Sequence, residues 1–152
     1  MRFGNGLINV WSLIDISQII RLNNNSNGDF DNEYNELCIN FITFLENSGI
    51  KTIYKEQELL FDTIGVKERE KYIIFFDKLI DMYYDILKIS NGVENIKNSN
   101  YFDNLKAIAM KNNPMKLLDK IDMLIEMKDT IKNNVNINLL IDSLIVSVGG
   151  TQ

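Results

Sequence analysis

The chain has 152 residues, the length of a single domain, and 45% of them are hydrophobic, as in ordinary globular proteins. Its 16 basic and 21 acidic residues give a net charge of −5, so we expect no polycationic surface and no direct binding of nucleic acid. The single cysteine, Cys38, excludes an internal disulfide and is typical of a reducing cytoplasm. The sequence has no export signal and no long uncharged apolar run, so we expect no membrane partner.

The sequence offers few groups for catalysis or ligand binding. It has no histidine, no phosphate-binding G-x-x-x-x-G-K-[ST] motif and no cysteine cluster. Asp77, Asp81 and Asp85 lie four residues apart, which could suit a cation or acid–base chemistry, but solvated helix charge explains this spacing more simply. We therefore expect no catalytic residue, no cofactor, no metal ion and no small-molecule ligand. Cys38 lies among apolar residues and is predicted to be buried and inert.

The N-terminal part of the chain is predicted to form a lead-in helix followed by a loop. Residues 7–22 place Trp11 and several aliphatic residues near one helical face, so Trp11 is interpreted as a core anchor. Residues 23–28, with the sequence NNNSNG, are predicted to form a polar loop. We accordingly divide the chain into a lead-in segment, 1–28, and a helical domain, 29–152.

Helical spacing of apolar residues continues through the middle of the chain. It predicts helices over 29–47, 55–64, 66–89 and 98–111. The 66–89 helix is rich in Phe and Tyr and has a narrow polar stripe, which is typical of a central helix in a bundle. The aromatic residues are therefore interpreted as core, not as a platform for stacking bases.

The next helix is marked at both ends. Asn113 is a good N-cap and Pro114, the only proline, suits the first helical position, while Asn133 and Asn134 suit the exit. Its inward face is predicted to hold Leu117, Leu118, Ile121, Leu124, Ile125 and Ile131. Its opposite, polar face is predicted to hold Lys116, Asp119, Lys120, Asp122, Glu126 and Asp129.

The final helix, 137–148, is capped by Asn136 and is unusually apolar. About half of its circumference is aliphatic, formed by Ile137, Leu140, Ile141, Leu144, Ile145 and Val148. Such a helix is either buried in its own core or shared between the core and a subunit interface. We take these six residues as subunit-interface candidates and expect part of the set to be exposed in the isolated domain. The whole chain is predicted to be an all-α bundle of about six helices.

Two patterns carry a family resemblance. The turn Asn134-Val135-Asn136 is followed by a short aliphatic helix, and an earlier helix ends in Tyr83-Tyr84-Asp85-Ile86-Leu87-Lys88 before a small loop. Both resemble the C-terminal domain of the delta-prime subunit of bacterial DNA polymerase III, although Tyr84 stands where that family tends to have arginine. Asn5-Gly6-Leu7-Ile8 is similar to the turn that precedes this domain in the family.

The resemblance implies a non-catalytic oligomerisation domain of a clamp loader. In that family the C-terminal domains of the subunits pack into a collar that supports loading of the sliding clamp, so the implied partners are the other clamp-loader subunits. It also implies that Met1 follows a missing ATPase-like module. Two alternatives remain from the residues themselves: a free-standing helical adaptor from a phage or a regulatory system, and an enzyme with a carboxylate site.

Overall fold

The computed structural model describes residues 24–48, 53–65 and 68–149. These residues form eight helical elements and no strand, so the prediction of an all-α bundle is confirmed. The elements are α2 (Asn24–Ser48), α3 (Ile53–Thr63), α4 (Arg69–Ser90), the 3-10 helix η2 (Ser99–Tyr101), α5 (Phe102–Met110), α6 (Pro114–Ile131), α7 (Ile137–Leu144) and the π-helix η3 (Ile145–Gly149). The predicted lead-in helix with Trp11 lies outside the described residues.

The chain divides into two compact units, Met1–Glu36 and Leu37–Gln152, and the division falls within α2. Because α2 begins at Asn24, the prediction of a loop is wrong for residues 24–28. A helix that is already nucleated gains one backbone hydrogen bond for each residue added, which offsets the poor helix propensity of Asn and Gly. The predicted domain boundary at residue 28 stays a prediction.

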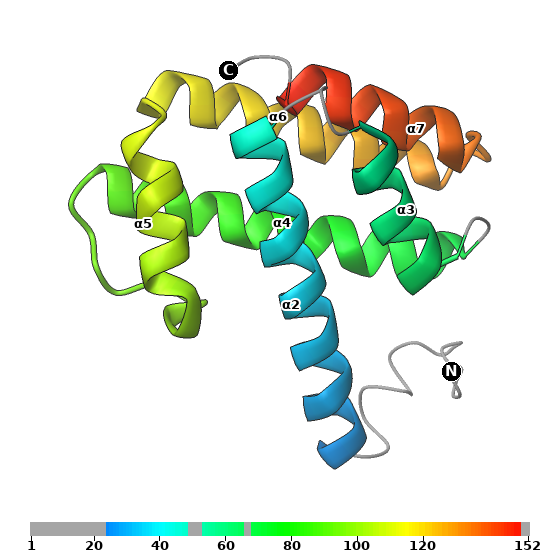
Figure 1. Ribbon diagram of the computed structural model, residues 1–152, viewed down its shortest axis with the longest axis horizontal. Helices are drawn as coiled ribbons and strands as arrows, with labels where there is room; N and C mark the ends of the chain where they lie inside the picture. The colour runs from blue at the N-terminus through cyan, green and yellow to red at the C-terminus, as the bar shows by residue number, and fades with distance from the viewer. Residues whose placement is uncertain (1–23, 49–52, 66–67, 150–152) are drawn as a thin grey trace. The chain divides into compact units, whose positions relative to one another are not determined.

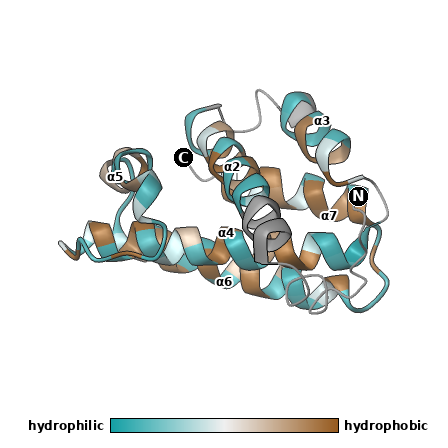
Figure 2. Cartoon of the chain, turned by 90° about the horizontal axis from the view of Figure 1, so that it is seen from below, coloured by the Kyte–Doolittle hydropathy of each residue, from teal (hydrophilic) through white to brown (hydrophobic). Residues whose placement is uncertain are grey.

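In the second unit, α4 is the central helix. It packs along α6 and against α5, while α7 contacts both α6 and α3 (Figure 1). Hydrophobic and hydrophilic residues alternate along these helices, as expected of elements with one side in a core (Figure 2). The packing places the C-terminal helix between two neighbours.

Aromatic rings fill the interior around α4. Phe41 and Phe75 pack edge to face with ring centroids 5.4 Å apart, and Phe75 makes similar contacts with Phe76 and Tyr72. All four side chains are fully or almost fully buried. This confirms that the aromatic stripe of α4 is core, because buried rings cannot stack on the bases of a nucleic acid.

The predicted N-caps of α6 and α7 are confirmed. Asn113 caps α6 by accepting from the backbone N–H of Lys116, with Pro114 in the first turn. α6 itself ends at Ile131, and Asn134, in the turn that follows, has a left-handed φ of 64°. Asn136 caps α7 by accepting from the N–H of Leu139 at 3.1 Å.

The polarity of α6 differs from the prediction at three positions. Lys120, predicted on the polar face, is only 1% exposed. Leu118 and Ile125, predicted on the inward face, are 44% and 39% exposed. Lys120 can turn inward because a buried carboxylate pairs with it, and this leaves the two aliphatic residues on the outer side of the helix.

Candidate functional site

The six interface candidates of the final helix are all buried within the chain. They are Ile137, Leu140, Ile141, Leu144, Ile145 and Val148. The expectation that part of this set is exposed is wrong, because α3 and α6 both pack against α7 and so cover more than one side of it. Whether any of the six contacts another subunit stays a prediction.

A different pair of apolar residues is exposed on the final helix. Leu139 is 66% exposed and Val146 is 50% exposed, and the exposed Ser143 lies between them. Seven residues correspond to about two helical turns, so these side chains lie on nearly the same side. Sequence reasoning missed them because it followed the densest apolar arc of the helix, whereas an interface can lie on the sparser side.

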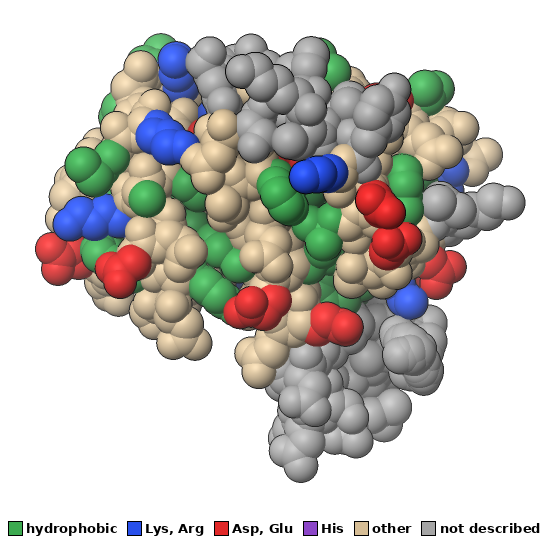
Figure 3. All heavy atoms as spheres, in the orientation of Figure 1, with side chains coloured by type: hydrophobic (Ala, Val, Ile, Leu, Met, Phe, Trp, Pro, Cys, Tyr) green, Lys and Arg blue, Asp and Glu red, His purple; other side chains and the backbone are tan. Residues whose placement is uncertain are grey.

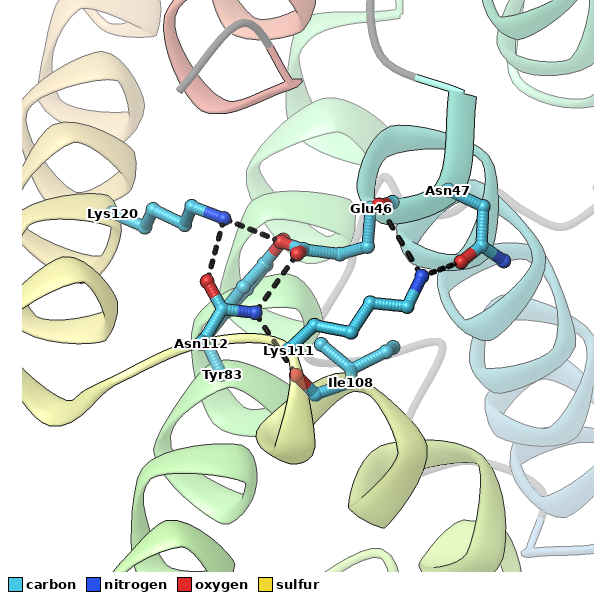
Figure 4. Close-up of polar contacts among 7 residues, drawn as sticks. All are labelled: Glu46, Asn47, Tyr83, Ile108, Lys111, Asn112 and Lys120. Atoms are coloured by element: carbon cyan, nitrogen blue, oxygen red, sulfur yellow. Dashed lines mark hydrogen bonds and ion pairs between the residues drawn. The ribbon is translucent and has the colours of Figure 1, made fainter. Parts of the chain in front are cut away.

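A buried polar cluster joins α2, α4 and α6 (Figure 4). The carboxylate of Glu46 accepts from Lys120 Nζ at 2.8 Å, from the Tyr83 hydroxyl at 2.7 Å and from Asn112 Nδ2 at 3.0 Å. Lys120 Nζ also donates to Asn112 Oδ1 at 3.0 Å. The charge of Lys120 is therefore balanced and its proton donors are directed to oxygen acceptors.

This cluster stabilises the packing of the helices that it joins. Glu46, Tyr83 and Lys120 are all buried. Burial, reinforced by the charge and hydrogen bond of Glu46, raises the pKa of Tyr83 well above its ordinary value. A neutral hydroxyl donor and a hydrogen-bonded ion pair are both stable in such a buried site.

The spaced carboxylates of α4 all form polar contacts with other residues of the chain. Asp85 is buried and accepts from the backbone N–H groups of Lys97 and Asn98 at 3.1 Å and 2.8 Å, and from Asn98 Nδ2 at 2.7 Å. Asp81 pairs with Lys97 and Asp77 pairs with Lys128. Asp85 thus fixes the loop between α4 and α5, and the described residues hold no group of three or more candidate metal ligands.

Arg69 fixes the Asn134–Asn136 turn to the start of α4. Its guanidinium donates to the carbonyl of Ile131 at 3.1 Å and to that of Val135 at 2.6 Å. The last carbonyls of a helix have no partner within the helix, so a basic side chain that reaches them stabilises the exit. Sequence reasoning did not find this role of Arg69, because Ile131 and Val135 lie 62 and 66 residues further along the chain.

Cys38 is fully buried, as predicted. Its Sγ lies 3.7 Å from the Phe75 carbonyl oxygen, and burial raises the pKa of the thiol well above its ordinary value. The thiol therefore stays protonated and is a poor nucleophile.

The outer side of α6 adds further exposed apolar residues. Met115 is 70% exposed, and Leu118 and Ile125 lie exposed on the same helix. The face drawn in Figure 3 carries both basic and acidic side chains, with hydrophobic side chains between them. No helix in the described ranges is long and apolar enough to cross a membrane.

These features define the class as an all-α bundle whose buried polar groups stabilise its packing and whose outer helices expose apolar side chains. Residues 29–148 match the family model described as "DNA polymerase III, delta subunit, C terminal". Because this match covers most of the chain, the chain belongs to that family. The chain is thus related to a clamp-loader subunit of DNA polymerase III. The match names delta, not the delta-prime subunit of the sequence-based resemblance. No curated protein and no solved structure gave a match.

Proposed function

We propose that this domain is a non-catalytic oligomerisation domain of the DNA polymerase III clamp loader. In this proposal it packs with the C-terminal domains of other subunits into a collar, which supports loading of the sliding clamp in the bacterial cytoplasm. Family membership supports the clamp-loader assignment. The observation that carries the assembly role is the exposure of large apolar side chains on α6 and α7, where an isolated domain would gain nothing from them.

We further propose that the subunit is delta-prime. The support is the pair of sequence patterns, each of which has a structural reason in this fold. The Asn134-Val135-Asn136 turn is bound by Arg69, and the Tyr83–Lys88 pattern contains Asp85, which holds the following loop. The family description names the delta subunit, so this finer assignment requires its own test.

The six buried residues of α7 and η3 have an indirect part in this proposal. They hold the final helix on α3 and α6, so that Leu139 and Val146 stay on its outer side. An alanine at Leu144 would then weaken assembly only by weakening the fold.

Reconstitution with the other clamp-loader subunits tests the proposal. The chain should co-elute with them in size-exclusion chromatography, and the double change Leu139→Gln and Val146→Gln should weaken the association without unfolding the domain. Ser143→Ala, between the two positions, is the matched control. Failure of the wild-type chain to associate with any clamp-loader subunit would contradict the function and favour a separate helical adaptor.

Competition identifies the subunit. The chain should displace full-length delta-prime from a reconstituted loader and leave delta in place. Displacement of delta instead would assign the chain to the delta position.

A further inference from the structure

The outer side of α6 exposes three apolar residues on one arc. Met115, Leu118 and Ile125 follow one another at intervals of three and seven residues, which places them within about 80° of the helix circumference. The opposite side of α6 packs on α4. The three side chains therefore form a stripe that no described element covers.

The same arc is acidic. Four exposed carboxylates lie within or beside it, so that all seven residues fall within about 120° of the helix circumference: Asp119, Asp122, Glu126 and Asp129. None of them forms an ion pair within the described residues, and the nearby Lys128 is committed to Asp77. Several lie three or four residues apart, where like charges on a helix repel and destabilise it. We call the three apolar residues and four carboxylates the α6 outer face.

The charge of this face limits what can bind it. A second copy of the chain would place carboxylates against carboxylates, and nucleic acid and anionic membranes would be repelled in the same way. A surface with basic side chains would instead relieve the repulsion along α6 and pair with acceptors that have no internal partner. Its apolar residues would cover Met115, Leu118 and Ile125.

We propose that the α6 outer face binds an amphipathic helix of a neighbouring subunit, in which lysine or arginine residues flank an apolar stripe. This rests on the proposed function, because the partner is taken to be another clamp-loader subunit. Electrostatic attraction selects and orients the partner helix, and burial of the apolar stripe against it provides the hydrophobic contribution to binding.

Charge reversal on the face tests this directly. The variant carries Asp122→Lys, Glu126→Lys and Asp129→Lys, all at exposed positions, and its binding to the remaining clamp-loader subunits is measured at low and high salt. We expect association to weaken about tenfold or more at low salt, and the difference from wild type to shrink as salt is added.

A matched control changes the charge by the same amount elsewhere. Glu58→Lys, Asp62→Lys and Glu94→Lys also lie at exposed positions, and this variant should bind within about twofold of wild type. Circular dichroism melting should show both variants folded.

The outcomes separate the inference from the function. If wild type assembles and the reversed α6 variant assembles equally well, the inference is wrong while the function stands. If wild type does not associate with clamp-loader subunits at all, the proposed function fails and the inference fails with it. Dimerisation of the wild-type chain that Leu118→Gln abolishes would also overturn the inference, because it would make a second copy the occupant.

Discussion

Each side of α6 holds an exception to the usual placement of charge and hydrophobicity. On the inner side, Lys120 is buried and pairs with Glu46. On the outer side, Leu118 and Ile125 are exposed among carboxylates. One amphipathic helix thus meets two separate requirements. Its inner side fixes the position of α6 within the bundle, and its outer side presents groups that would be stabilised only by a partner.

The largest expected effect is on the inner side. Lys120→Met removes the charge that balances Glu46 and leaves a buried carboxylate, so we expect the free energy of unfolding to fall by about 3–5 kcal/mol. Urea denaturation followed by circular dichroism measures this. Lys116→Met, at an exposed position one turn earlier, should change stability by less than about 0.5 kcal/mol. Equal effects of the two changes would mean that the buried pair does not hold the inner side in place.

The second largest effect on stability is expected where Arg69 binds the C-terminal end of α6. Arg69→Met removes two charge-assisted hydrogen bonds to the carbonyls of Ile131 and Val135, and should lower the free energy of unfolding by about 2 kcal/mol. Arg69→Lys should recover part of the loss, because an ammonium group lacks the planar fork with which the guanidinium bonds both carbonyls. A full recovery would show that charge alone matters and that the two-carbonyl geometry does not.

The sequence predicted most helices and the aromatic core because these depend on local spacing. Asn113, Pro114, Asn134 and Asn136 mark helix ends through contacts within a few residues, so their roles could also be inferred. The inward turn of Lys120 could not be inferred, because its partner Glu46 is 74 residues away. A pattern rule that places every lysine outside and every leucine inside fails where a distant group supplies the compensating charge.

The buried interior should also respond to high pH. Burial raises the pKa of Cys38, and burial together with the Glu46 charge raises the pKa of Tyr83. In the unfolded chain both groups ionise near their ordinary values, about 8.5 and 10, so the unfolded state holds fewer protons above those values. The contribution of these two groups to the free energy of unfolding should therefore be fully present below about pH 8.5. It should fall as pH rises, by up to about 1.4 kcal/mol per pH unit for each group. Cys38→Ala should flatten the decline between about pH 9 and 10, and an unchanged slope would contradict the burial of this thiol.

The smallest effect on stability is expected on the outer side of α6. Leu118→Gln with Ile125→Gln should change the free energy of unfolding by no more than about 0.5 kcal/mol. Leu117→Ala, one position away but fully buried, should cost about 2–5 kcal/mol. Thermal melts of the two variants measure the contrast. A large loss in the outer variant would place Leu118 and Ile125 in the core and remove the distinction between the two sides.

The accessibility of Met115 before and after assembly tests most directly whether the outer side of α6 is an assembly surface. Mild peroxide converts exposed methionine to the sulfoxide, and mass spectrometry reads each site. In the isolated chain Met115 should oxidise readily and the buried Met82 should not. With the other clamp-loader subunits bound, we expect Met115 to become protected while Met82 stays unchanged. Undiminished oxidation of Met115 in the assembled complex would contradict the claim that the outer side of α6 is an assembly surface.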